Sequence, residues 1–190
     1  MDVGKTLYVK TRREWRAWLA KHHKTAAEIW LIYYKKHSGK PRIPYNDAVD
    51  EALCYGWIDS ITKPVDDRCW AQRYSPRKAK SVLSPMNRER VRRLIAAKRM
   101  TKAGLASIAH TFDHRTETKP LPKFQVPADV ARALRRVPGA WKHFQAFPES
   151  YKRIRVGWIV MARHRRDVFL QRLNYFVQKT ALGERFGMVQ

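Results

Sequence analysis

A change in hydrophobic periodicity at Pro127 constrains the fold of this chain more than any other feature. Before it, short β-rich runs alternate with helical patterns, whereas after it apolar residues recur only at helical spacing. Residues 113–127 between them combine prolines with alternating charge, as linkers do. The sequence therefore predicts an α+β fold: a small antiparallel sheet packed with helices over 1–112, a linker over 113–127, and a C-terminal bundle of short helices over 128–190.

Capping residues and periodicity locate the expected elements. Thr11 suits the N-cap of one helix, and Ser84 followed by Pro85 suits the start of another. In the first region we expect helices over 12–23, 44–55, 85–99 and 101–111, and strands over 27–35, 57–63 and 69–75. In the second region we expect helices over 128–136, 138–146, 148–162 and 164–179.

The chain is strongly basic. Its 40 Lys and Arg against 16 Asp and Glu give a formal charge of +24, which attracts polyanions such as nucleic acid, anionic lipid or phosphorylated metabolites. The alternative is a general compositional bias with no specific partner. Six of the 16 acidic residues gather in one stretch, Asp47 to Asp67, just before the most basic one. This sorting favours a polarised surface.

Several classes of protein are disfavoured. Two cysteines do not make a disulfide scaffold or a cysteine-type metal site. His110 and His114 share a helical face but lack a third ligand, so no metal and no cofactor are expected. No apolar run is long enough to span a membrane, and the first residues lack the apolar core of a signal peptide. We therefore expect a cytoplasmic protein without a transmembrane segment.

The richest polar segment runs from Tyr55 to Asn87, reading YGWIDS and then RYSPRKAKSVLSPMN. A hairpin turning near Val65 would place Asp59 opposite Arg73 on one face of the sheet. Asp59 would then orient the guanidinium of Arg73, whose planar fork suits carboxylate or phosphate. The predicted ligand-binding residues are Trp57, Asp59, Arg73, Ser75, Arg77, Ser81 and Asn87.

Other interpretations of this segment stay open. The plain alternative is a cross-strand ion pair, with Ser84 as an ordinary helix cap. An enzyme would use Asp59 as a general base, but no second carboxylate or histidine is near in sequence, and Arg73 would lower its pKa. Enzymatic activity is thus uncertain and less favoured than binding of an anionic or polar small molecule. Non-specific nucleic-acid binding would use arginines of 85–99 and the C-terminal helices, through salt-sensitive phosphate contacts.

A family resemblance covers residues 8 to 173. Its most specific part is ALCYGWIDS, then YSPRKAKS and an asparagine; EWRAWLAKHH, RMTKAGLASI and the C-terminal LPKFQVPADVARAL and ESYKRIRVGWIVMARHRRDVF extend it. The chain resembles the YdeI/OmpD-associated family, also described as bacteriocin-protection proteins. It departs from the family at Leu83, where a tryptophan is usual.

The resemblance implies a bacterial cytoplasmic protein connected with envelope stress and protection against bacteriocins or antimicrobial peptides. It implies no established reaction, cofactor or catalytic residue, and oligomeric state stays open. So basic a chain is poorly suited to capturing cationic peptides directly. The sequence therefore favours a non-catalytic binding protein with a role in stress protection.

Overall fold

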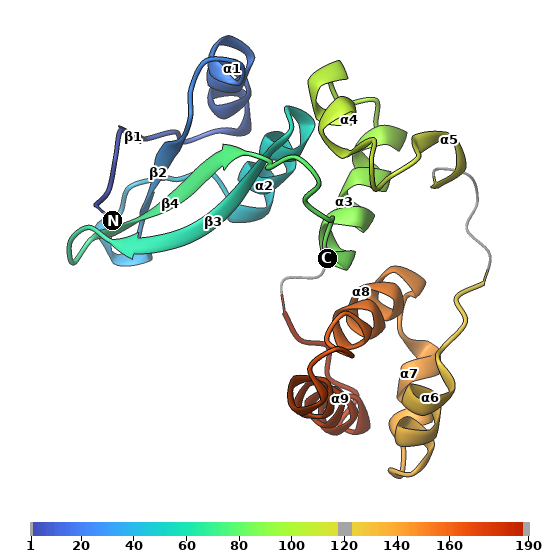
Figure 1. The fold of residues 1–190 in the computed structure, drawn as a ribbon. Helices are drawn as coiled ribbons and strands as arrows, with labels where there is room; N and C mark the ends of the chain where they lie inside the picture. The colour runs from blue at the N-terminus through green and yellow to red at the C-terminus, as the bar shows by residue number, and fades with distance from the viewer. Residues whose placement is uncertain (1, 118–122, 188–190) are drawn as a thin grey trace. The chain divides into compact units, whose positions relative to one another are not determined.

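The computed structural model describes residues 2–117 and 123–187 (Figure 1). The chain forms two compact units. One comprises Met1–Val82 with Arg90–Thr118, and the other comprises Leu83–Glu89 with Lys119–Gln190. The predicted boundaries 1–112, 113–127 and 128–190 stay a prediction.

Part of the predicted linker is helical, because α5 covers His114–Glu117. The side chain of Asp113 caps this short helix, accepting from the backbone N–H of Arg115 at 2.9 Å. Residues 118–122 of that linker lie outside the described residues.

A four-stranded sheet forms the centre of the first unit, in the order β1-β2-β4-β3. The strands are β1 (Thr6–Leu7), β2 (Ile29–Tyr34), β3 (Trp57–Pro64) and β4 (Cys69–Pro76). β2, β4 and β3 are antiparallel, but β1 runs parallel to β2. The α+β class is confirmed. The prediction of a purely antiparallel sheet is corrected by this short parallel strand.

The β3–β4 hairpin does not have the predicted register. Asp59 pairs with Tyr74, and Trp57 pairs with Pro76. The carboxylate of Asp66 accepts from the backbone N–H groups of Arg68 and Cys69 at 2.7 and 2.8 Å, which centres the turn further along than Val65. A register shift between Asp59 and Thr62 then moves the pairing again. Asp59 and Arg73 therefore lie on opposite faces of the sheet.

Helices precede, separate and follow the strands of this sheet along the chain. The elements are α1 (Arg12–His22), the 3-10 helix η1 (Lys36–Ser38), α2 (Tyr45–Cys54), α3 (Pro85–Ala96) and α4 (Lys102–Ile108). Thr11 caps α1 by accepting from the N–H of Glu14, and Ser84 accepts from the N–H of Asn87 at 3.2 Å. Both predicted caps are confirmed. The start of α3, up to Glu89, belongs to the second unit.

α1 and α2 cover the sheet face that carries Tyr74. Trp15 of α1 is fully buried, donates its indole N–H to the carbonyl of Ala48 at 3.0 Å, and contacts the Tyr74 ring edge-on at 5.4 Å. Trp18 contacts Trp57 in the same way at 5.7 Å. Large aromatic side chains thus supply most of the apolar area that fixes α1 on the sheet.

Gly104 lets α4 approach the end of α2 very closely. A Cβ at this position would lie 2.2 Å from the carbonyl oxygen of Cys54. The same oxygen accepts from the N–H and the hydroxyl of Thr101, at 3.0 and 2.6 Å. The C-terminal carbonyl of α2 is thereby satisfied by the N-cap residue of α4.

The second unit is helical, as predicted for this region. It contains α6 (Ala128–Arg135), α7 (Ala140–Ala146), α8 (Glu149–Val160) and α9 (Arg166–Ala181). Their apolar faces meet in one core that includes Val130, Leu134, Ala140, Phe144, Tyr151, Val156, Ile159, Leu173, Phe176 and Val177. Among the described residues, the helices are all too short or too polar to cross a membrane.

Candidate anion-binding site

Three carboxylates lie on one helix, α2, at helical spacing. Asp47 and Glu51 are four residues apart, and Asp50 lies beside Glu51. Asp50 is 3% exposed and Glu51 is fully buried. Because burying an unpaired carboxylate is very costly, these two side chains require cationic partners.

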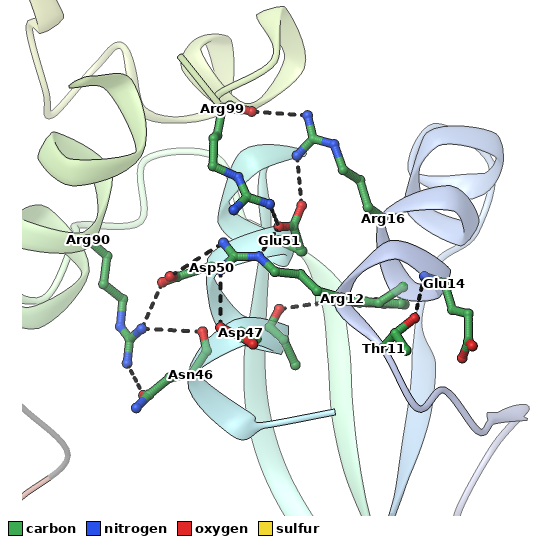
Figure 2. A network of polar contacts seen from close by, with 12 residues as sticks. Thr11, Arg12, Glu14, Arg16, Asn46, Asp47, Asp50, Glu51, Arg90 and Arg99 are labelled. Carbon is green, nitrogen blue, oxygen red and sulfur yellow. Dashed lines mark hydrogen bonds and ion pairs between the residues drawn. The ribbon is translucent and has the colours of Figure 1, made fainter. Parts of the chain in front are cut away.

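Glu51 is bound by three arginines from different parts of the chain (Figure 2). Arg12 and Arg16 reach it from α1; the Nη1 of Arg16 donates to Oε2 at 2.7 Å. Arg99, between α3 and α4, donates to the other oxygen, and its carbonyl accepts from Arg16 at 3.2 Å. A single buried carboxylate therefore connects α1, α2 and the start of α4.

Asp50 connects α2 to α3 in the same manner. Arg90 donates to Oδ1 at 2.7 Å and Arg93 donates to Oδ2 at 2.6 Å. Arg12 bridges the two groups, lying 3.1 Å from Asp47 and 3.7 Å from Asp50 (Figure 2). None of these arginines and carboxylates is among the ligand-binding residues predicted from the sequence.

The network carries more positive than negative charge, since five arginines share three carboxylates. Burial disfavours the charged form of Arg12, but its hydrogen bond and charge interaction with Glu51 outweigh burial, so the pKa of Arg12 lies above its ordinary value. The same balance raises the pKa of Arg16. Arg12 and Arg16 are therefore cationic under physiological conditions.

A pocket of about 560 Å³ opens on this network. Its lining consists of Arg12, Arg13, Arg16, Ala17, Ala20, Tyr55 and Arg99. The guanidinium of Arg16 lies over the Tyr55 ring, 5.3 Å from its centroid. Arg13 makes no ion pair with any residue that the structure describes. The pocket thus offers cationic donors around a small apolar and aromatic surface, an arrangement that suits an organic or inorganic anion.

The predicted site residues separate into several environments. Trp57 is 1% exposed, and its indole N–H donates to the carbonyl of His23 at 3.1 Å, so it belongs to the core. Asp59 accepts from the hydroxyl of Tyr45 at 2.6 Å. Burial, and then the hydrogen bond to Asp59, raise the pKa of Tyr45 well above its ordinary value, which keeps this phenol protonated.

Arg73 has a different acidic partner from the one predicted. It pairs with Glu28, at 2.6 Å from Nη2 and 2.7 Å from Nε to the same oxygen, while Ser75 pairs with Ile58 across the hairpin. The predicted brace between Asp59 and Arg73 is wrong, because their strand positions place them on opposite faces. Hydrogen bonds from Trp30 and Arg73 lower the pKa of Glu28.

Arg77 and Ser81 are brought together after β4. The Nη2 of Arg77 donates to the carbonyls of Ser81 and Val82, at 3.3 and 3.2 Å. The Arg77 Nε and the Ser81 Oγ are buried without a hydrogen-bond partner. Burial lowers the pKa of Arg77, consistent with a guanidinium that lacks a carboxylate. The carbonyl of Ser81 also contacts a ring nitrogen of His110 at 3.0 Å.

Asn87 is the last of the predicted residues. It belongs to the second unit, whereas the other six belong to the first. Its backbone N–H donates to the Oγ of Ser84, so the local structure is the helix cap of the plain alternative. The described residues contain no group of three or more His, Cys, Asp or Glu side chains that could hold a metal ion.

Both cysteines are buried free thiols. Burial, reinforced by the charge of Glu51, raises the pKa of the Cys54 thiol to about 11. Such a thiol is protonated near neutral pH and is a poor nucleophile.

A signal for the arginine pocket is present in the sequence. Arg12 and Arg16 are four residues apart on a predicted helix, as are Asp47 and Glu51 on the next one. Matching pairs of opposite charge at helical spacing indicate two helices that face each other. Arg99 carries no such signal, because its place at the pocket depends on the close contact between α4 and α2.

The fold and the pocket define the chain as an α+β protein with an arginine-lined pocket and an additional helical unit. It belongs to the family described as a domain of unknown function, DUF8412, which matches residues 7–107. Residues 123–183 match the family described as "Bacteriocin-protection, YdeI or OmpD-Associated", which confirms the resemblance noted in the sequence. No curated protein and no solved structure matches the chain.

Proposed function

We propose that this protein is a non-catalytic, cytoplasmic binding protein for a small anion, which it holds in the pocket formed by α1, Tyr55 and Arg99. The observation that carries the proposal is the charge of the pocket lining. Four arginines and no carboxylate line it. Glu51 binds three of these arginines, and Arg12 also pairs with Asp47 and Asp50. The lining therefore keeps an uncompensated positive charge that an anion would neutralise.

The available donors support the same conclusion. A guanidinium carries five N–H donors, and the hydrogen bonds to Glu51 engage only one nitrogen of Arg99. Arg13 has all of its donors available. Phosphate and carboxylate groups match the planar guanidinium fork, and the pocket volume is within the usual range of small-molecule sites, about 300–1,000 Å³.

Calorimetric titration with pyrophosphate and with inorganic phosphate would test the proposal. In Arg13→Ala, we expect the Kd for pyrophosphate to rise about tenfold, because one charge-assisted contact is lost without disturbing the Glu51 network. Lys21→Ala is the matched control, since it removes one positive charge from the same helix outside the pocket. Equal affinities in the two variants would refute the pocket as the binding site.

Arg77 and Ser81 provide a second candidate position for the same function. Their unpartnered Nε and Oγ atoms are a specific reason to retain these two residues of the predicted set as a ligand-binding hypothesis. Under this alternative, Arg77→Ala would abolish pyrophosphate binding and Arg13→Ala would leave it unchanged. Titrating both variants against the same ligand therefore separates the two positions.

Nucleic acid is a competing anion for so basic a chain. Binding that depends on many phosphate contacts weakens steeply as salt rises, whereas binding in a small pocket depends less on salt. Measuring the affinity for a short DNA duplex and for pyrophosphate over a range of salt concentrations distinguishes them. Tighter binding of the duplex, with a steep salt dependence that Arg13→Ala does not alter, would favour a nucleic-acid function.

We infer further that anion binding serves protection against bacteriocins or other envelope stress. The description of the family matched by residues 123–183 supports this role. The test is survival of a host strain that lacks the gene, complemented with the original chain, Arg13→Ala or Lys21→Ala, during exposure to a bacteriocin. If Arg13→Ala protected the strain as well as Lys21→Ala does, protection would not depend on anion binding in the pocket.

A further inference from the structure

Arg155 of α8 is a buried arginine with no counter-ion among the described residues. Its side chain is 7% exposed, and it forms no ion pair with any residue in the described part of the chain. Its Nη2 donates to the carbonyl oxygen of Phe186, while its Nε is buried without a partner. Buried arginines are nearly always paired, so this unsatisfied donor requires an explanation.

The segment after α9 occupies the surroundings of Arg155. The Phe186 ring lies against the Arg155 guanidinium, 4.4 Å from ring centroid to Cζ, and edge-on to Tyr175 at 4.8 Å. Trp158 and Phe176 complete an aromatic cage at 6.1 and 6.4 Å. The backbone N–H of Phe186 donates to the hydroxyl of Tyr151 at 3.3 Å.

The contacts of Phe186 therefore resemble those of a peptide ligand in a binding site. Its ring is enclosed by aromatic side chains, its N–H is bound by Tyr151, and its carbonyl is bound by Arg155. One feature does not match. The Nε and Nη2 of an arginine form one edge that binds the two oxygens of a carboxylate together, but a peptide carbonyl supplies only one oxygen.

We propose that the cage around Arg155 is a binding site for an aromatic carboxylate, such as the carboxyl-terminal Phe or Tyr of a peptide, and that residues 183–187 occupy it in the free protein. In such a ligand, the ring would replace that of Phe186 and the carboxylate would bind both Nε and Nη2 of Arg155. This assignment accounts for the unpartnered Nε and for the missing counter-ion. It concerns the second unit and is independent of the arginine pocket.

Burial in the cage lowers the pKa of Arg155, because the loss of hydration outweighs the opposing hydrogen bond and charge interaction with Tyr151. A bound carboxylate would supply the missing opposite charge. Capture of a terminal carboxylate by a preformed donor group is an established mode of peptide recognition. The geometry and the electrostatics of Arg155 thus favour the same class of ligand.

The occupying segment is held in place by a tight contact. Gly187 has a φ of +74°, and a Cβ there would lie 2.1 Å from Nη2 of Arg155. Just before the segment, Leu182 is 69% exposed and adds little burial. A ligand must displace the segment, so its apparent affinity falls by the fraction of molecules in which the cage is open. Changes that release the segment should therefore strengthen binding.

The experiment uses the full chain and a short peptide ending in Phe, with a free carboxylate or as the amide. In Gly187→Ala, where a side chain is strained at this positive φ and would also meet the Arg155 guanidinium, we expect the free-acid peptide to bind about tenfold more tightly than to the original protein. We expect the amide to bind at least about tenfold more weakly than the acid, because it cannot use the Arg155 edge. Calorimetric titration of each peptide into the protein provides the readout.

Gly139→Ala is the matched control. It imposes a similar backbone strain, φ +77°, elsewhere in the same unit, so it should leave the peptide affinity unchanged. Arg155→Lys keeps the charge but removes the fork, so it should abolish the preference for the acid over the amide. If Gly187→Ala does not fold by circular dichroism, Phe186→Ala empties the cage instead.

A second ligand separates two sources of the same chemistry. Binding of 3-phenylpropionate as tightly as the peptide would identify a free aromatic acid, whereas a clear preference for the peptide would identify a protein terminus. Absence of binding to both Gly187→Ala and Phe186→Ala would overturn the proposal. Equal binding of acid and amide would do so as well.

Discussion

The two units accommodate buried arginines in opposite ways. Around α2 in the first unit, carboxylates neutralise them, since Glu51 alone binds three guanidinium groups. In the second unit, aromatic rings and carbonyl oxygens take this role for Arg155 and Arg172. Arg172 lies 4.6 Å from the ring centroid of Trp158 and donates to its carbonyl at 2.6 Å, and Arg155 contacts Phe186 similarly.

The difference shows which partner controls stability in each unit. Removing the buried carboxylate of Glu51 from the first unit takes the shared partner from three part-buried arginines, which is strongly destabilising. Removing Arg155 or Arg172 from the second unit leaves only neutral rings and carbonyls. The second unit has few carboxylates: its described residues include Glu89, Asp129, Glu149, Asp167 and Glu184. Glu89 is already paired with Arg153, at 2.9 Å.

The largest expected effect is that of Glu51→Gln. It leaves Arg12, Arg16 and Arg99 without their shared carboxylate, so we expect a loss of about 3–5 kcal/mol in the free energy of unfolding. Urea denaturation followed by circular dichroism measures it. Asp67→Asn, on the exposed hairpin turn, should change stability by no more than about 0.5 kcal/mol. A similar loss in both variants would contradict the role of Glu51.

The second prediction concerns pH. The pKa of Cys54 is raised in the folded state, to about 11 from an ordinary value of 9.0, so the folded protein retains the thiol proton longer than the unfolded chain. The contribution to stability is complete below pH 9 and is lost as pH rises to 11, by about 2–3 kcal/mol. The difference in unfolding free energy between the original chain and Cys54→Ala, measured across this range, tests it. A difference that does not vary with pH would argue against it.

Arg155→Met should have a smaller effect, although Arg155 is almost as buried as Asp50. Methionine fills similar apolar space and leaves no carboxylate unpaired, so we expect a loss of about 1 kcal/mol. Urea denaturation again provides the measurement. If the loss matched that of Glu51→Gln, the contrast between the two units would fail.

The smallest effect is expected at an exposed pair of the second unit. Arg163 and Asp129 are 2.8 Å apart, with side chains 49% and 46% exposed. Asp129→Asn should change the unfolding free energy by about 0.5 kcal/mol or less, and the change should shrink further in high salt. Thermal unfolding at two salt concentrations measures this. A change above about 1 kcal/mol would show that exposed carboxylates also stabilise this unit.

Local signals predicted most of the helices and strands, but not the details that position side chains. Thr11 and Ser84 cap the predicted helices because capping depends on residues only three apart. The predicted register of the β3–β4 hairpin was wrong for a different reason. It depends on the turn set by Asp66 and on the shift between Asp59 and Thr62, and neither follows from alternation of apolar residues.

The arginine pocket shows a similar limit. The paired spacing on α1 and α2 was visible in the sequence, yet Arg99 lies 48 positions from Glu51. Its contribution depends on helix packing, which no local pattern contains. Arg73 likewise pairs with Glu28, a residue 45 positions away, through the neighbouring β2 strand.

The absent side chain of Gly104 has a consequence for the evolution of this protein. Because α4 reaches Cys54 only through that glycine, a methyl group there would act as a wedge and carry Arg99 away from Glu51. Positions 104 and 99 should therefore covary among relatives. In relatives that replace the glycine, Arg99 would no longer reach Glu51 and would not be retained. Loss of both residues would therefore indicate loss of the pocket.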